Sequence, residues 1–331
     1  MTVLITGGSG FIGLNLAEQL LARGETVVLY DIGPPPSSAA LELARLPGKL
    51  AQVQGDVTDR DALGGVFARH GVDRVIHAAA ITAGPERDAA EPRRIAEVNF
   101  IGTLNVLEAA RAQGVRRFVQ ASTGAIYGAA GVGAAQPLDE ERDRPVPESM
   151  YGITKYAAER ACLRLAALWK MDVRVGRLAS AYGRWEYESG LRDRLSPPTL
   201  IARLALAGAE AVFPPLGATD YIYAPDVARA LIALLDTASP AHRLYQLGTG
   251  KPWALPEWCA ALAAIDPAFR WRETARLEEC NVLPLTPVTR TAFSNRRLVD
   301  DMGYAPRYDV REAASDFMAW LAARREESAW T

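Results

Sequence analysis

The sequence predicts an α/β protein: a Rossmann-type, doubly wound parallel sheet with a smaller C-terminal α/β cap. Two patterns support this prediction. Short apolar runs alternate with longer amphipathic stretches through the first half of the chain, which is the order of parallel strands with helices on both faces. A glycine-rich turn, GGSGFIG, joins the first apolar run to the first amphipathic stretch, as in nucleotide-binding sheets.

The sheet half is expected to contain strands and helices in regular alternation. Strands are expected at residues 3–6, 26–30, 51–54, 74–77, 117–121 and 172–178, and helices at 11–23, 59–70, 93–113 and 151–170. The segments 33–38 and 127–137 are rich in glycine, proline and small residues, so we expect them to be surface loops.

The pattern becomes irregular from about residue 180, with charges, prolines and shorter periodic pieces. Strand or helix pieces are expected at residues 200–207, 220–223, 225–235, 244–247 and 254–264, and a final helix at 310–324. We therefore expect a sheet domain over residues 1–179 and mainly a substrate-binding cap over 180–331, with about 219–250 returning to the sheet domain. The tryptophans Trp253, Trp258 and Trp320 are expected in the core.

Composition excludes several classes of protein. The chain has 331 residues, of which 23% are charged, and a formal net charge of −2, which favours neither nucleic acid nor an anionic membrane surface. No apolar run reaches membrane-spanning length, and the N-terminus lacks the features of a secretory signal, so we expect a cytoplasmic protein. Cys162, Cys259 and Cys280 are widely spaced and the histidines are scattered, so we expect buried or free thiols and no metal site.

The glycine-rich turn predicts a dinucleotide site. Gly7, Gly10 and Gly13 let the backbone turn sharply and approach a pyrophosphate, and the following helix offers unpaired N–H groups. The spacing G-x-x-G-x-x-G alone could also be a structural turn. Asp31 ends the next strand, where a carboxylate binds ribose hydroxyls and repels a 2′-phosphate, so we predict NAD rather than NADP. The alternative for Asp31 is a helix cap or loop acid.

Further residues near the glycine turn and at strand ends are predicted to contact NAD. They are Phe11, Ile12, Asp56, Val57, Ala78, Ala79, Ala80 and Leu178. Small residues at a strand end let a cofactor pass close to the backbone, although they also suit tight packing. Asp56 could equally be a turn residue.

The segment YGITK, residues 151–155, places Tyr151 and Lys155 one helical turn apart on one face. This spacing arises often by chance, so alone it carries little information. It gains weight because QASTGAIYG ends a strand upstream, at the sheet edge where doubly wound folds bind ligands. A nearby ammonium favours phenolate and lowers the pKa of tyrosine from its ordinary value of about 10, which suits proton transfer.

The ordered motifs resemble those of the extended short-chain dehydrogenase/reductase family, the NAD-dependent epimerase/dehydratase group. They are TGGSGFIG, GDVTD, HAAA, VNFIGTLNVLEAA, ASTGAIYG, YGITK and DYIYAPDVA, over roughly residues 1–235. The resemblance implies hydride transfer between NAD and a hydroxyl-bearing carbon. It makes Tyr151 the acid/base, Lys155 its cationic partner and a ligand of the nicotinamide ribose, and Thr123 the hydroxyl that holds the reacting oxygen.

The resemblance also implies roles outside the reaction itself. Ser122 is expected near the nicotinamide, and Asn99 is expected to support the cofactor site indirectly rather than to act in catalysis. Relatives usually pair as homodimers through two helices, which here correspond to about 93–113 and 150–170.

Departures from the family pattern bear on the substrate. Gly124 and Ala125 stand where dehydratases carry Asp and Glu, so neither can protonate a leaving hydroxyl. Ser180 replaces an asparagine, and Thr219 replaces a diphosphate-binding arginine, that are usual in nucleotide-sugar enzymes. The missing cation matters because charge-assisted bonds to phosphate are strong.

The segment GRWEYESGLRDRLSPP offers candidate substrate contacts. Together with Thr123 and Ser180, these are Arg184, Trp185, Arg192 and Arg194. An arginine there could clamp a carboxylate. The alternative is a set of exposed ion pairs with Glu186, Glu188 and Asp193.

Our first prediction is an NAD-dependent oxidoreductase that acts on a secondary alcohol or carbonyl of a small sugar, polyol or sugar acid. The alternative is a nucleotide-sugar epimerase with tightly bound NAD, and a less favoured one is a non-catalytic NAD-binding regulatory protein. The first predicts net NADH formation, and the second predicts isomerisation without it.

Overall fold

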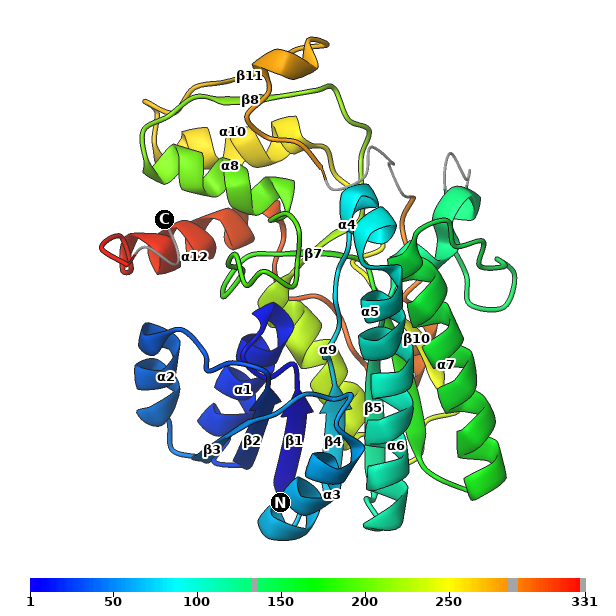
Figure 1. Cartoon of the computed structure of the whole chain (residues 1–331). Helices are drawn as coiled ribbons and strands as arrows, with labels where there is room; N and C mark the ends of the chain where they lie inside the picture. Colours follow the sequence, from blue (N-terminus) through cyan, green and yellow to red (C-terminus); the bar gives the residue numbers. More distant parts are fainter. Residues whose placement is uncertain (132–135, 285–290, 328–331) are drawn as a thin grey trace.

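The structure is a computed structural model that describes residues 1–131, 136–284 and 291–327. Its centre is a parallel sheet of seven strands in the order β10-β6-β5-β4-β1-β2-β3, which is the predicted doubly wound arrangement (Figure 1). The seven strands are β1 (Thr2–Thr6), β2 (Thr26–Asp31), β3 (Lys49–Gln54), β4 (Arg74–His77), β5 (Arg117–Thr123), β6 (Val173–Leu178) and β10 (Leu244–Leu247).

Helices cover both faces of this sheet. Residues along each strand alternate between two apolar clusters: Val3 and Ile5 pack with α1 and α9, whereas Leu4 packs with α3, α6 and α7. Because both faces are buried, the central strands β1, β2 and β4 are mostly apolar, and this made them recognisable in the sequence. The helices are α1 (Phe11–Ala22), α9 (Ala224–Asp236), α3 (Arg60–His70), α6 (Gly102–Ala112) and α7 (Met150–Trp169).

Three predicted segments differ in part from the structure. The loop expected at 33–38 gives way at its end to helix α2 (Ser37–Ala44). The single helix expected at 93–113 is instead divided, and prolines begin α4 and α5 because proline suits the first turn of a helix. The predicted range is covered by α5 (Pro92–Ala96), the π-helical turn η1 (Glu97–Ile101) and α6, and a separate short helix, α4 (Pro85–Ala90), precedes them. Of the loop expected at 127–137, residues 132–135 lie outside the described residues, and the 3₁₀ segment η2 (Gly124–Gly131) covers its beginning.

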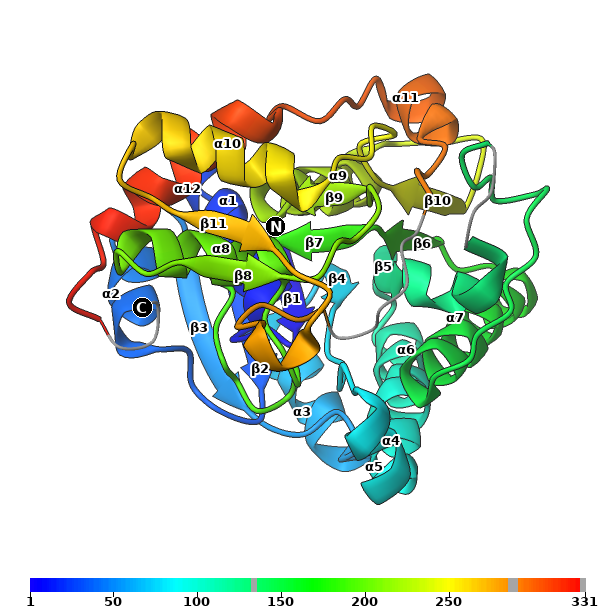
Figure 2. The ribbon, with the colours of Figure 1, turned by 90° about the horizontal axis from the view of Figure 1, so that it is seen from above.

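The cap lies over the carboxyl ends of the strands (Figures 1 and 2). Two short parallel pairs belong to it, β7 with β9 and β8 with β11. The ring centroid of Tyr182 lies 5.7 Å from that of Trp253 and 5.2 Å from that of Trp258. The three tryptophans that were predicted in the core, Trp253, Trp258 and Trp320, are buried. The elements here are β7 (Ser180–Tyr182), α8 (Pro197–Leu206), β8 (Ala211–Phe213), β9 (Tyr221–Tyr223), α10 (Leu255–Ile265), β11 (Trp271–Glu273), η3 (Leu277–Glu279), α11 (Arg296–Met302) and α12 (Val310–Ala322).

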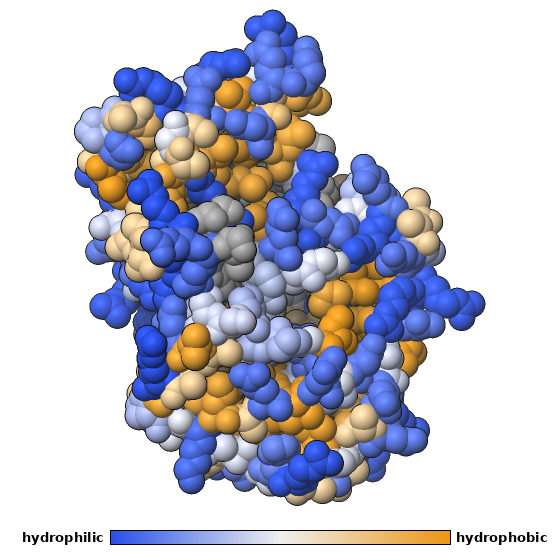
Figure 3. Space-filling model, turned by 60° about the vertical axis from the view of Figure 1, so that its left-hand side comes forward, coloured by the Kyte–Doolittle hydropathy of each residue, from blue (hydrophilic) through white to orange (hydrophobic). Residues whose placement is uncertain are grey.

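The surface and the thiols agree with the composition. The face in Figure 3 is mostly hydrophilic, with apolar side chains in separate patches. Among the described residues, no helix is long and apolar enough to cross a membrane, and no group of three potential metal ligands occurs. The three cysteines are free thiols, as predicted.

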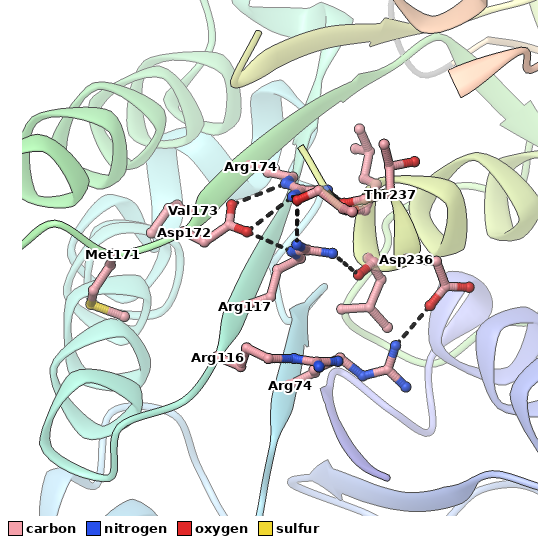
Figure 4. Close-up of polar contacts among 12 residues, drawn as sticks. Arg74, Arg116, Arg117, Met171, Asp172, Val173, Arg174, Asp236 and Thr237 are labelled. Carbon is pink, nitrogen blue, oxygen red and sulfur yellow. Dashed lines mark hydrogen bonds and ion pairs between the residues drawn. The ribbon is translucent and has the colours of Figure 1, made fainter. Parts of the chain in front are cut away.

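Three buried arginines, Arg74, Arg117 and Arg174, begin neighbouring strands at the amino edge of the sheet, away from the cap (Figure 4). Arg174 donates to Asp172 at 2.9 and 3.0 Å, and to the carbonyls of Leu234 and Thr237 at 2.6 Å each. Those carbonyls end helix α9, whose negative dipole end favours cations. The cluster therefore joins three strands to one helix terminus.

Candidate active site

A cavity of about 670 Å³ opens at the carboxyl edge of the sheet, beneath the cap. Residues at or after the ends of six neighbouring strands, β3, β2, β1, β4, β5 and β6, line it, together with residues from the cap. This is the edge at which doubly wound sheets bind ligands, because helix N-termini and free strand ends converge there.

The glycine turn forms one wall of the cavity with no room for side chains. Gly7 has a φ of +67°, and a Cβ there would lie 2.7 Å from the backbone nitrogen of Ala79. A Cβ on Gly13 would lie 2.1 Å from the carbonyl oxygen of Gly7. The backbone between β1 and α1 is therefore exposed to a ligand at close range, as a pyrophosphate site requires.

Asp31 lines the cavity at the end of β2. Its carboxylate accepts the backbone N–H groups of Ser9 at 3.0 Å and of Ile32 at 2.7 Å. Burial raises the pKa of Asp31, and these N–H groups only partly offset that rise. The carboxylate is thus fixed beside the glycine turn, where the ribose of a dinucleotide would lie.

The three catalytic candidates line the same cavity. Thr123 ends β5, and Tyr151 and Lys155 lie one turn apart at the start of α7, where Ser149 caps the helix by accepting the N–H of Gly152 at 3.1 Å. Lys155 is buried, and this burial lowers its pKa to about 8, with Cys162 and Glu159 opposing the shift.

The chain matches the family model "NAD dependent epimerase/dehydratase family" over residues 3–248. The chain belongs to this family. It is 30% identical to a UDP-glucose 4-epimerase of Rhizobium leguminosarum bv. trifolii, covering 97% of each chain. It also matches a solved UDP-glucose 4-epimerase of Thermus thermophilus in complex with NAD, with 27% identity, a TM-score of 0.76, and 96% and 99% of the two chains covered.

A second solved structure, MoeE5 in complex with UDP-glucose and NAD, is 26% identical with a TM-score of 0.78 and covers 99% of this chain and 100% of that one. The prediction of the extended short-chain dehydrogenase/reductase family and of NAD as cofactor is confirmed. This protein is therefore an NAD-dependent enzyme of the epimerase/dehydratase family.

Most of the residues predicted to contact NAD line the cavity. The residues that line it are Gly7, Gly10, Phe11, Ile12, Gly13, Asp31, Asp56, Val57, Ala78, Ala79, Ala80, Ser122, Tyr151, Lys155 and Leu178. Asn99 does not line it. Its buried side chain donates to the carbonyl of Ile81 at 3.0 Å and accepts the N–H of Ile81 at 2.8 Å, so it shapes the loop after β4. This is the indirect role that the resemblance implied.

Sequence reasoning missed other residues of the cavity. Arg94 donates to Asp56 at 2.6 Å. Burial alone would raise the pKa of Asp56, but the hydrogen bonds from Thr58 and Arg94 more than offset this effect, so the pKa of Asp56 is lowered. The hydroxyl of Tyr187 donates to the carbonyl of Ser9 in the glycine turn at 2.8 Å. No sequence pattern marked these contacts, because they join segments that are distant in the chain.

A buried polar network supports the catalytic strand end from below. Ser122 donates to Glu159 at 3.0 Å, and Glu159 pairs with Arg177 at 2.6 Å. Arg177 also donates to the hydroxyl of Tyr127 at 2.6 Å, and this hydroxyl accepts a bond from Gln246 at 2.9 Å. The family's catalytic helix α7 is thus tied to strands β5, β6 and β10.

The candidate substrate contacts divide into two groups. Ser180, Arg192 and Arg194 line the cavity, as does Thr219. Arg184 and Trp185 do not, so the structure corrects this part of the prediction.

Both excluded residues instead make structural contacts, Arg184 within the cap and Trp185 between the cap and α1 of the sheet domain. Arg184 forms a two-pronged ion pair with Asp316 of α12 rather than with the nearby acids of its own segment. Trp185 is fully buried, and its indole N–H donates to Glu18 at 2.7 Å. Packing of this kind cannot be read from one segment, because each partner lies on a different helix.

Proposed function

We propose that this enzyme is an NAD-dependent epimerase of a nucleotide sugar, which oxidises a sugar hydroxyl and reduces the resulting ketone from its other face. One observation carries the proposal: the same cavity contains the glycine turn, the Thr123–Tyr151–Lys155 set and a further wall formed by the cap. Its relatives support the choice of substrate, because they include UDP-glucose 4-epimerases that match nearly the whole chain.

The residues of the chain take the following parts in this reaction. Tyr151, as phenolate, removes the proton of the hydroxyl and returns it after the hydride has come back. Lys155 stabilises the phenolate, and Thr123, whose oxygen already accepts the N–H of Ala125 at 3.1 Å, donates its own proton to the reacting oxygen. The bound NAD supplies the hydride acceptor and donor.

The proposal replaces our first prediction of a small sugar, polyol or sugar-acid substrate. The comparisons support the nucleotide-sugar alternative better. A dehydratase remains disfavoured, because Gly124 and Ala125 line the cavity beside Thr123 and neither carries a group that could protonate a leaving hydroxyl. Since Thr219 offers no charge, we assign Arg194 of the cavity wall to the substrate diphosphate.

The test is to incubate the purified enzyme with UDP-glucose, UDP-galactose and other nucleotide sugars, and to follow sugar composition and absorbance at 340 nm together. We expect interconversion of a pair of sugars without net NADH. The opposite result, stoichiometric NADH from a free sugar or polyol with no isomerisation of any nucleotide sugar, contradicts the proposal and restores the dehydrogenase prediction.

We also propose that the chain divides into a sheet domain over residues 1–179 and a mainly cap domain over 180–331, with about 219–250 returning to the sheet.

We further propose a homodimer through the helices at about 93–113 and 150–170. Three large apolar side chains on these helices are exposed: Ile101, Ile153 and Leu168. A second copy packed there would cover them. Sedimentation of the wild type and of Ile153→Arg tests the dimer, which the variant should weaken.

A further inference from the structure

The chain after β7, residues 184–196, is anchored to the rim of the cavity formed by α1 and the glycine turn. The carbonyl of Arg184 accepts the side-chain amide of Asn15 at 2.8 Å. Tyr187 donates to the carbonyl of Ser9 at 2.8 Å, and Trp185 is bound to α1 through Glu18. This segment runs between the cap and the top of α1 (Figure 1).

The same segment is anchored again on the loop that follows β4. The backbone N–H of Thr82 donates to the carbonyl of Leu191 at 2.8 Å, and that of Asp193 donates to the carbonyl of Thr82 at 3.2 Å. The carboxylate of Asp193 accepts the N–H of Gly84 at 2.7 Å and pairs with Arg87 at 3.2 Å. Residues 184–196 therefore form a strap fixed on both sides of the nucleotide cavity.

Between these anchors the strap presents side chains to the cavity. Five residues of its middle part line it: Tyr187, Glu188, Ser189, Leu191 and Arg192. The glycine turn and Asp31 line the same cavity. A dinucleotide laid on the glycine turn is consequently enclosed between the turn and the strap.

Arg192 is held in a defined position within the strap. Its guanidinium carbon lies 5.7 Å from the ring centroid of Phe11, the first residue of α1. Its Nε is 3.2 Å from the carboxylate of Glu186 and donates to the carbonyl of Arg194 at 3.0 Å. The cation therefore lies close to the helix N-terminus that receives a pyrophosphate.

Glu186 makes this position rigid. Its carboxylate is fully buried and accepts the N–H of Ser196 at 2.8 Å, the hydroxyl of Ser196 at 2.6 Å and that of Thr199 at 2.5 Å. Each of these bonds fixes the acid, and the fixed acid fixes the Nε end of Arg192. Within the described part of the chain, the hydrogen bond and ion pair of Arg192 both use its Nε, and its outer nitrogens are available to a ligand in the cavity that Arg192 lines.

We propose that Arg192 binds the pyrophosphate of NAD beside the N-terminus of α1, and that the strap closes over the cofactor so that NAD stays bound through successive turnovers. Two positive groups, the guanidinium and the helix N-terminus, then flank one anion. This assigns Arg192 to the cofactor and not to the substrate. The proposal rests on the family's cofactor, and through retention of NAD it deepens the proposed epimerase function, which needs the same hydride returned.

The experiment compares Arg192→Gln with Arg194→Gln, a matched loss of one charge two residues away on the same cavity wall. NAD-loaded protein is passed through a desalting column, and NAD release is then followed in the presence of a trapping excess of a nucleotide-free NAD-binding enzyme. We expect R192Q to release NAD roughly ten- to a hundredfold faster than wild type, the effect of one charge-assisted bond, and R192K to recover part of the retention. R194Q is expected to retain NAD like wild type.

Folding and anchoring are checked separately. Release from every variant is measured well below the thermal midpoint of its cofactor-free form, so that unfolding does not contribute, and Tyr187→Phe, which removes one anchor without touching Arg192, should release NAD faster than wild type. Equal release from R192Q and wild type, or equal acceleration in R192Q and R194Q, overturns the proposal, and so does a higher KM for a nucleotide sugar with unchanged NAD release. Since release is measured without substrate, a failure of the epimerase proposal leaves this result interpretable.

Discussion

The two edges of the central sheet use charged side chains in opposite ways. At the amino edge, Arg74, Arg117 and Arg174 are buried and bind carboxylates and helix-end carbonyls of the chain itself. At the carboxyl edge, Asp31 accepts backbone N–H groups and Lys155 is buried, but both residues line a cavity. Both edges contain buried charge, and what distinguishes them is whether the bonding capacity of the charge is used within the chain.

This difference separates stability from chemistry. Charges that bind one another at the amino edge hold strands and helix α9 in place, so their loss should cost free energy of unfolding and leave the reaction intact. Loss of a charge that faces the cavity should instead impair the reaction and leave the free energy of unfolding largely intact. Variants at either edge test whether the separation holds.

The largest expected effect is at the carboxyl edge, in Tyr151→Phe. The variant lacks the proton acceptor, so we expect kcat to fall by about a thousandfold, within the range of general acid–base catalysis. Its thermal midpoint should match that of the wild type, because the ring remains in place. Steady-state rates and thermal unfolding measure the two quantities; unchanged turnover contradicts the assigned role of Tyr151.

At the amino edge, Arg174→Met should act on stability alone. The substitution leaves Asp172 with one fewer partner and leaves the carbonyls of Leu234 and Thr237 without their donor, so we expect a loss of about 3 kcal/mol in the free energy of unfolding. Urea titration measures this loss, and kcat per folded molecule should stay within about twofold. If Arg174→Met is as stable as the wild type but has impaired catalysis, the proposed separation between stabilising charges at the amino edge and functional charges at the carboxyl edge is wrong.

The sequence predicted most of what local pattern determines. Apolar strands, the glycine turn and the residues at strand ends were recognisable because each depends on a few neighbouring residues. The division of the helix near Asn99 was not predictable, because the π-helical turn coincides with contacts between Asn99 and Ile81, which belong to another segment. Arg184 was misread for the same reason, since its partner Asp316 lies 132 residues away.

The buried lysine provides a test by pH at the carboxyl edge. The pKa of Lys155 is lowered from 10.5 to about 8 in the folded protein, so the unfolded chain binds more protons between those values. The cost of burying the charge is therefore present in full below about pH 8 and disappears as the pH rises toward 10.5. As the pH rises through this window, the free energy of unfolding of the wild type should therefore increase by about 3 kcal/mol relative to that of Lys155→Met.

This measurement uses cofactor-free protein. Equilibrium unfolding in urea at several pH values gives the free energies of unfolding. Lys170→Met, at the exposed end of α7, is the control. The difference in free energy of unfolding between this variant and the wild type should not change with pH over the same window. A constant difference between wild type and K155M over the window shows that the ammonium of Lys155 is not destabilised by burial. In that case the site lacks the electrostatic feature that we assign to its catalytic edge.

The smallest expected effect concerns the choice of cofactor at Asp31. In Asp31→Ser the backbone donors of Ser9 and Ile32 lose their carboxylate, and the ribose of NAD loses one charged acceptor, so we expect the Kd of NAD to rise about tenfold. The repulsion of a 2′-phosphate is lost as well, which should bring the Kd of NADP closer to that of NAD. Titration of both cofactors by intrinsic fluorescence measures the ratio. An unaltered preference for NAD in D31S means that other residues of the cavity exclude the 2′-phosphate, and that the carboxylate of Asp31, like the arginines of the amino edge, is committed to the chain's own backbone.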